Sequence, residues 1–183
     1  MAAAEPLRSQ EEVDAVRAAI RTPRDLCLFT LGVNLCFRAS DVTSLTVGDV
    51  KYLKAGDALC IKEQKTSKKR SATLNEDCVK SIALYLEERP GAKDDEPLFL
   101  TRTGGAFSRF DYCARVKAWT RAAGLRGNYS VHTLRKTKPT LARKAGVDWA
   151  TISKFLNHSN QNVTMAYLGV SDGEVNKLYE MKI

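Results

Sequence analysis

Both histidines of this chain of 183 residues, His132 and His158, lie between residues 131 and 170. Imidazole is the side chain whose ordinary pKa lies nearest to neutrality, so it can move a proton or donate a hydrogen bond to a phosphate. Arg135 follows His132 by one helical turn, and a guanidinium group binds anions. Tyr167 lies nine residues after His158. These four residues are therefore the first candidates for a reactive site.

The chain carries an excess of positive charge. It has 29 lysines and arginines against 21 aspartates and glutamates, which gives a net charge of +8. Such an excess is expected of a protein that binds the phosphate backbone of a nucleic acid. A basic surface also keeps a protein in solution, so the charge alone leaves both explanations open. The length suits one domain with a real core, and the only turn-rich stretch, residues 89–96, is no longer than a loop.

The cysteines and the apolar runs of the sequence indicate where in the cell the protein is expected. The five cysteines are odd in number, form no CxxC pair and lie mostly among apolar residues, where a thiol behaves as a small hydrophobe. This usage indicates a reducing compartment. No apolar run approaches the roughly 18 residues of a membrane span, and the N-terminus lacks the basic start and apolar core of a secretory signal. We therefore expect a cytoplasmic protein with no membrane partner.

Hydrophobic periodicity predicts a mostly helical chain. Residues 10–20 place apolar side chains on one helical face, and Thr22 with Pro23 begins a second, buried helix that ends at Arg38. We predict further helices over residues 40–45, 75–88, 108–123, 132–145, 148–156, 162–168 and about 172–181. Asp148 and Asp172 are expected to be N-caps, Gly124 and Gly146 to end helices, and Trp119 and Trp149 to be core residues rather than base-stacking platforms.

Between residues 50 and 74 the period of the pattern changes to two. Two short strands flank the polar stretch "QKTSKK", which predicts an antiparallel hairpin with a basic tip. The predicted fold class is therefore α+β, mainly α-helical, with one small antiparallel sheet.

Polar residues that interrupt these patterns form a set of six, namely Arg38, Lys65, His132, Arg135, His158 and Tyr167. Arg38 follows an apolar helix, so its head must either reach solvent or bind an anion. His132 and Arg135 are spaced i, i+3 and can reach one ligand from a shared helical face. Taken singly, each residue also has an ordinary explanation on a surface or in a core.

The order of the set resembles the tyrosine recombinases, the phage-integrase family. "HTLR", then "LNHS" and then a tyrosine nine residues after His158 resemble the C-terminal signature of that family. "FRASDVTSLTVGDV" resembles its first-arginine motif, and "KTSKKRSATL" resembles its basic hairpin, which places Lys65 at the catalytic lysine. The resemblance extends from about Pro23 to Val170. It implies a catalytic domain that breaks and rejoins DNA.

The resemblance also implies a chemistry for the site. A tyrosine oxygen of the family attacks a DNA phosphodiester, forms a 3′-phosphotyrosyl bond and frees a 5′-hydroxyl, so no ATP or other cofactor is needed. Tyr167 is then the nucleophile and His132 its general base. Arg38 and Arg135 stabilise the charge on the phosphate, and His158 donates a further hydrogen bond to it.

The general acid and the nucleophile each have alternatives. Lys65 is the predicted general acid that protonates the departing 5′ oxygen, with Lys62 and Lys68 as alternatives because sequence does not fix the register of the hairpin. Tyr179 is the alternative nucleophile, although it lacks the spacing from "LNHS". No metal is predicted, because the two histidines are 26 residues apart and have no carboxylate pair nearby.

The predicted partner is double-stranded DNA, with self-association on the DNA as the tetrameric synapse of the family. We expect residues 1–22 to be the remnant or linker of a missing DNA-binding domain and residues 23–183 to be the catalytic domain. Phosphate contacts are assigned to the basic stretches "KTSKKR", with Lys65, Lys68, Lys69 and Arg70, and "LARK". A type IB topoisomerase-like enzyme and a DNA-binding protein that keeps the fold without cutting are the alternative functions.

Two residues depart from the family pattern. Pro139 lies inside the predicted helix 132–145, where it removes a hydrogen bond and costs about 3 kcal/mol. It should kink the helix or delay its start, and either would move Arg135 or His132. Asn157 replaces the usual glycine before His158, and asparagine tolerates the left-handed backbone conformation.

Overall fold

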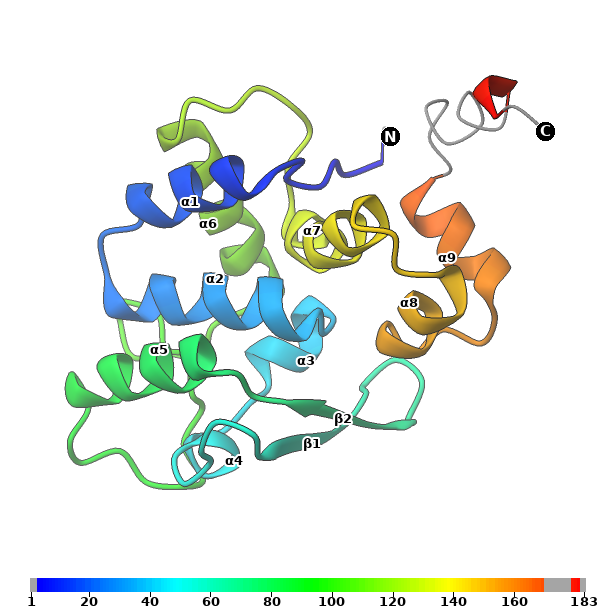
Figure 1. The fold of residues 1–183 in the computed structure, drawn as a ribbon. Coiled ribbons are helices and arrows are strands. Elements are labelled where there is room, and N and C mark those ends of the chain that lie inside the picture. Colours follow the sequence, from blue (N-terminus) through cyan, green and yellow to red (C-terminus); the bar gives the residue numbers. More distant parts are fainter. Residues whose placement is uncertain (1–2, 170–178, 182–183) are drawn as a thin grey trace. The chain divides into compact units, whose positions relative to one another are not determined.

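The computed structural model describes residues 3–169 and 179–181, which fall into two compact units, Met1–Lys138 and Pro139–Ile183. The first unit contains α1 (Gln10–Ala19), α2 (Pro23–Leu35), α3 (Ala39–Thr43), α4 (Val47–Val50), β1 (Ala58–Lys62), β2 (Lys69–Thr73), α5 (Glu76–Glu87) and α6 (Arg109–Ala122) (Figure 1). The boundary between the units lies inside α7 (Val131–Lys144). The second unit contains α8 (Trp149–Phe155) and α9 (Gln161–Leu168).

The predicted fold class, mainly helical with one small antiparallel sheet, is confirmed. The short helix α4 was not predicted, although Thr46 and Asp49 form a reciprocal capping box at its start. Asp172 and most of the helix predicted over residues 172–181 lie outside the described residues. None of the helices in the described part of the chain is both long and apolar enough to cross a membrane.

Helix α2 is the buried centre of the first unit. Thr22 caps it by accepting the backbone N–H of Asp25, and Pro23 occupies its first turn, as predicted. Most of its residues are buried, the polar Asp25 and Thr30 among them, and α5 packs along it (Figure 1). Gly32 allows other helices to approach closely, because a Cβ there would lie 2.2 Å from the hydroxyl oxygen of Tyr112 in α6. The same Cβ would lie 2.8 Å from Cδ1 of Leu134 in α7, so α6 and α7 are both placed by this glycine.

The residues before α2 also pack in the first unit. Helix α1 contacts α6, and Leu7 is fully buried with its backbone N–H donated to the hydroxyl of Thr137 at 3.0 Å. The assignment of residues 1–22 to a remnant or linker of another domain stays a prediction. Trp119 is confirmed as a core residue, since it is buried and donates its indole N–H to Asp25.

The hairpin lies where it was predicted. β1 and β2 pair antiparallel, in a register that runs from Ala58 opposite Thr73 to Lys62 opposite Lys69. Residues 63–68 form the connection, and Lys65 is exposed on it. The alternation of the strands turns Leu59 and Arg70 inward, while the flanking lysines face solvent.

Helix α7 resolves one of the two expectations for Pro139. The helix begins at Val131 and contains Pro139 in its interior, so the expectation of a later start is wrong. His132 therefore lies in the first turn and Arg135 in the second. Proline supplies no N–H to the helical ladder, and the i−4 bond that it omits is the one to the backbone carbonyl of Arg135.

The second unit is built from well-capped helices. Asp148 caps α8 by accepting the N–H of Thr151 at 2.9 Å, as predicted. Asn160 caps α9 by accepting the N–H of Val163 at 3.1 Å. Helices α8 and α9 pack against each other. Asn157, which follows α8, has φ 56°, so the expectation that it takes the left-handed conformation is confirmed.

Candidate active site

The carbonyl oxygens at the C-terminal end of α2 bind two arginines. The helix ends at Leu35, earlier than predicted, because Cys36 takes the left-handed conformation with φ 51°. Arg70 donates from Nη2 to the carbonyl of Leu35 at 2.9 Å and from Nη1 to that of Cys36 at 3.1 Å. Arg135 donates from Nη1 to the same Cys36 carbonyl at 2.5 Å. The last carbonyls of a helix lack helical donors and carry partial negative charge, so this end is a natural site for cations.

Both of these guanidinium groups are buried. Arg135 is 4 % exposed and Arg70 is 6 % exposed, and Arg70 also stacks over the ring of Phe37. Burial, together with the nearby positive charge of Arg135, lowers the pKa of Arg70 to about 10, so the group is still a cation at neutral pH. Arg135 is thus a fixed positive charge in the first unit.

Arg38 lies just beyond this helix end and pairs with a buried carboxylate. Its Nη1 is 2.6 Å from Oε2 of Glu63, and the Arg38 side chain keeps 22 % of its surface exposed. The other oxygen of Glu63, Oε1, is 3.7 Å from Nη1 of Arg70. A chain of contacts therefore connects Arg38 through Glu63 and Arg70 to the Cys36 carbonyl that also holds Arg135.

Sequence reasoning missed Glu63 and misassigned Arg70. The prediction that Arg70 contacts DNA phosphate is wrong, because its side chain is turned into the protein and is bound to backbone carbonyls. The alternation of inward and outward side chains along the two strands could have shown that Glu63 and Arg70 face the interior. Leu59, Ile61 and Glu63 share one face of their strand and its extension, and Arg70 shares the inward face of β2 with Ala72.

Lys65 is exposed, but both of its neighbours are anchored. The backbone N–H of Gln64 is donated to Oδ1 of the buried Asp41 at 3.0 Å. The hydroxyl of Thr66 is donated to Oε2 of Glu63 at 2.6 Å. The lysine head can therefore move while the backbone on either side of it is held.

The pKa of His132 is held below its ordinary value. It is exposed in the first turn of α7, where its backbone N–H is donated to the hydroxyl of Ser130. Partial desolvation of the ring lowers its pKa below 6.5, and the charges of Arg135, Lys136 and Lys65 lower it further. A neutral imidazole can accept a proton.

The second unit brings His158 and Tyr167 together. Their ring centroids are 5.5 Å apart with an angle of 89° between the rings. Nδ1 of His158 lies 2.9 Å from the hydroxyl oxygen of Thr164, a fully buried residue that sequence reasoning missed. Thr164 and Tyr167 are spaced i, i+3 on α9, so the histidine sits against one face of that helix. The alternative nucleophile, Tyr179, is 84 % exposed.

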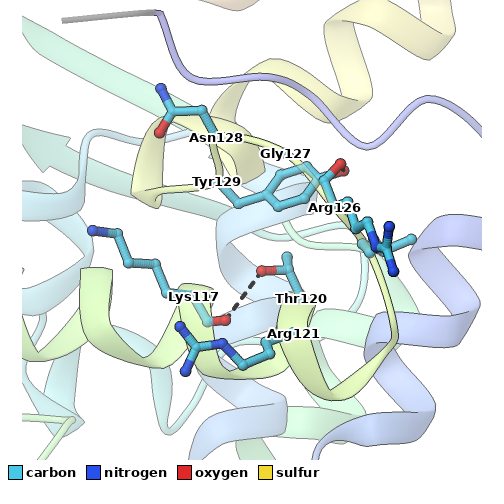
Figure 2. A pocket seen from close by; sticks show the side chains of 8 residues that line it. Lys117, Thr120, Arg121, Arg126, Gly127, Asn128 and Tyr129 are labelled. Atoms are coloured by element: carbon cyan, nitrogen blue, oxygen red, sulfur yellow. Dashed lines mark hydrogen bonds between the residues drawn. The ribbon is translucent and has the colours of Figure 1, made fainter.

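A cavity of about 310 Å³ opens at the C-terminal end of α6, and none of the six predicted site residues lines it. Its lining consists of Lys117, Thr120, Arg121, Leu125, Arg126, Gly127, Asn128 and Tyr129. Figure 2 shows Lys117 and Arg121 on one side of the cavity and Arg126 on the other. Within residues 3–169 and 179–181, no three His, Cys, Asp or Glu side chains group as metal ligands would.

Comparison with known sequences gives the class of protein. The sequence model of the phage integrase family matches residues 7–174, so the chain belongs to the phage integrase family. It is similar to the tyrosine recombinase XerC of Caldanaerobacter subterraneus subsp. tengcongensis, with 36% identity over 156 residues, 83% of this chain and 43% of that relative. It is also similar to the probable integrase/recombinase YoeC of Bacillus subtilis, with 32% identity over 180 residues, 97% of this chain and 96% of that relative.

Solved structures give the same fold. The XerA recombinase superposes with a TM-score of 0.79 at 20% identity, over 96% of this chain and 63% of that chain. XerH bound to a palindromic difH substrate superposes with a TM-score of 0.79 at 22% identity, over 94% of this chain and 51% of that chain. The fold is that of a tyrosine recombinase catalytic domain. The chain spans less than half of the XerC relative and nearly all of YoeC.

The corrected role of Arg70 predicts a difference between two neighbouring residues. Arg70→Gln should lower the free energy of unfolding by about 3 kcal/mol, because it removes one partner of a buried ion pair and leaves the Glu63 charge under-compensated. Lys69→Gln, at an exposed position, should change it by less than about 0.5 kcal/mol. Urea unfolding followed by circular dichroism measures both. Equal effects of the two substitutions would contradict the structural role of Arg70.

Proposed function

We propose that this chain is the catalytic domain of a site-specific DNA recombinase or integrase, which cleaves and rejoins DNA strands through a 3′-phosphotyrosyl intermediate. The observation that carries the proposal is the fixed pair of guanidinium groups around the end of α2, in a chain of the phage integrase family. Planar, permanently charged groups suit a phosphodiester, whose charge grows on the non-bridging oxygens in the transition state.

The phosphate is bound by three groups in this proposal. Arg135 supplies a charge that the Cys36 carbonyl holds in place, and Arg38 supplies a second one whose side chain still reaches solvent. Pre-set donors cost no reorganisation when the reaction occurs, which is why buried, fixed guanidinium groups favour catalysis over mere binding. His158 donates a further hydrogen bond, and its contact with Thr164 orients the ring.

Proton transfer needs one base and one acid. Tyr167 loses its proton to His132 as its oxygen forms the bond to phosphorus, and the lowered pKa of His132 keeps that base ready at neutral pH. The bond from phosphorus to the 5′ oxygen breaks, and Lys65 gives that oxygen a proton. Lys62 and Lys68 are the alternative acids, but Lys65 alone of the three has both neighbours in the chain anchored to buried carboxylates.

Duplex DNA is the proposed partner. XerH was solved bound to its difH substrate, and lambda integrase was solved as a dimer bound to a core site. Exposed lysines of the hairpin supply phosphate contacts here, namely Lys62, Lys65, Lys68 and Lys69.

We propose that this chain also self-associates on DNA as a tetrameric synapse. The non-cutting alternative depended on displacement by Pro139, and the start of α7 at Val131 removes the delayed start on which part of that argument relied.

The nucleophile can be tested with a nicked suicide duplex, from which the cleaved fragment dissociates and leaves a trapped adduct. A library with randomised sequence around the nick avoids the need to know the target. The unmodified protein should give an adduct that resists denaturation, and Tyr167→Phe should give none while keeping its fold and its affinity for DNA, because only the attacking oxygen is lost. Tyr179→Phe is the matched control. If Tyr179→Phe is the inactive variant, the nucleophile is misassigned.

The base can be tested by the pH dependence of adduct formation. Protonated imidazole cannot accept a proton, so the rate should fall on the acid side of the His132 pKa, by about tenfold per pH unit for a single group. Because the pKa of His132 is lowered, the midpoint of this fall should lie below pH 6.5. His132→Gln should reduce the rate and abolish this acid limb. An unchanged acid limb in that variant would remove His132 from the role of base.

A further inference from the structure

The buried carboxylate of Glu63 contacts Arg38 and the loop that carries Lys65. We infer that Glu63 is a positioning residue that orients Arg38 and holds the loop of Lys65, and this inference rests on the proposed cleavage reaction. Glu63 lies at the start of the hairpin connection and is 1 % exposed. It does not face solvent where a duplex could touch it, so it acts through its neighbours.

One carboxylate oxygen of Glu63 contacts both Arg38 and Thr66. Oε2 of Glu63 lies 2.6 Å from Nη1 of Arg38 and accepts the hydroxyl of Thr66 at 2.6 Å. The backbone of Glu63 closes the connection as well. Its N–H is donated to the carbonyl of Lys68 at 2.9 Å, and its carbonyl accepts the N–H of Ser67 at 2.8 Å. The residue therefore joins the arginine and the loop through a single fixed point.

The carboxylate must be charged for this arrangement to be stable. A buried carboxylate is costly unless cations and hydrogen bonds compensate it, and here Arg38 and Arg70 face its two oxygens. Arg70 is itself fixed by the carbonyls of Leu35 and Cys36. The end of α2 therefore holds Arg70 in place, and Arg70 in turn holds Glu63. A neutral amide of the same size would have to present an NH2 group toward one of two guanidinium groups, where donor would meet donor.

The two contacts serve two different steps of the proposed reaction. Holding Arg38 favours stabilisation of the charge on the non-bridging oxygens, while holding Thr66 fixes the backbone next to Lys65, the proposed acid for the leaving oxygen. Asp41 anchors Gln64 on the other side of Lys65, so loss of the Thr66 contact frees one of two anchors. Removing the Glu63 charge should impair both steps, and removing the Thr66 hydroxyl should impair only the second.

A change of leaving group separates these effects. The trapping library first yields a cleaved sequence, and that duplex is then made with either oxygen or sulfur at the bridging 5′ position. A thiolate departs without a proton from an acid, so sulfur should restore the rate wherever a variant acts through Lys65. Single-turnover adduct formation at saturating protein is measured for Glu63→Gln, Thr66→Val and Thr66→Ser, with Lys65→Ala and Arg38→Ala as references.

With oxygen, Thr66→Val should lose about tenfold and Thr66→Ser, which keeps the hydroxyl, should match the unmodified protein within about twofold. Sulfur should restore Thr66→Val and Lys65→Ala but not Arg38→Ala. Glu63→Gln should lose about 10² with oxygen and recover only in part with sulfur, because the effect on Arg38 remains. DNA affinity should stay within about twofold in Glu63→Gln, since Glu63 is buried and is not expected to touch the duplex.

Two outcomes overturn the inference alone. One is an adduct rate for Glu63→Gln equal to that of the unmodified protein, and the other is a loss in Thr66→Val that is the same with oxygen and with sulfur. Circular dichroism at the assay temperature shows whether each variant is folded, and if Glu63→Gln is not, the Thr66 pair decides. If the unmodified protein forms no adduct with either duplex, the proposed function fails and the inference fails with it.

Discussion

The carbonyl oxygens at the C-terminal end of α2 determine where the guanidinium groups of Arg70 and Arg135 lie. Cys36 turns left-handed, and the Leu35 and Cys36 carbonyls then bind Arg70 from the hairpin and Arg135 from α7. The sequence predicted that the helix continues to Arg38, but it ends at Leu35. The early end therefore fixes two distant elements against one point and releases Arg38 beyond it.

Charge balance explains why so many cations can be buried together. Three guanidinium groups, those of Arg38, Arg70 and Arg135, are compensated by backbone carbonyls and by the buried carboxylate of Glu63. The formal positive charge still exceeds the negative charge, before the exposed Lys65 is counted. In the function that we propose, a phosphodiester supplies a further anion to this cluster. Arginine suits this place better than lysine, because its planar fork can satisfy a carbonyl or carboxylate and still present other donors.

Local chemistry made much of this fold predictable. The caps at Thr22 and Asp148 and the left-handed Asn157 follow from single residues and their neighbours, and the structure has each of them. The six candidate site residues were selected by their order along the chain, and their roles stay predictions. That order identifies residue types but not their partners, so the carbonyl that holds Arg135 and the threonine that contacts His158 were missed.

The errors have a common physical cause. Charged residues near a hairpin tip are usually solvated, which led Arg70 to be placed among the phosphate contacts, and strand alternation was not applied to the charged positions. Pro139 was expected to kink α7 or to delay its start, from local energetics alone, and the structure contradicts the delayed start. Tertiary contacts of Thr137 and Leu134 with the first unit lie before the proline, and the helix starts where its first turn packs.

The most direct measurement identifies the covalent bond itself. Adduct trapped on the nicked duplex is digested with nuclease and trypsin, and the modified peptide is sequenced by mass spectrometry. Tyr167 and Tyr179 fall in different tryptic peptides, because Lys177 lies between them. Our account predicts a nucleotide joined through its 3′ phosphate to Tyr167, and a released strand whose 5′-hydroxyl a kinase can label. A nucleotide on Tyr179, or one joined through a 5′ phosphate, would contradict it.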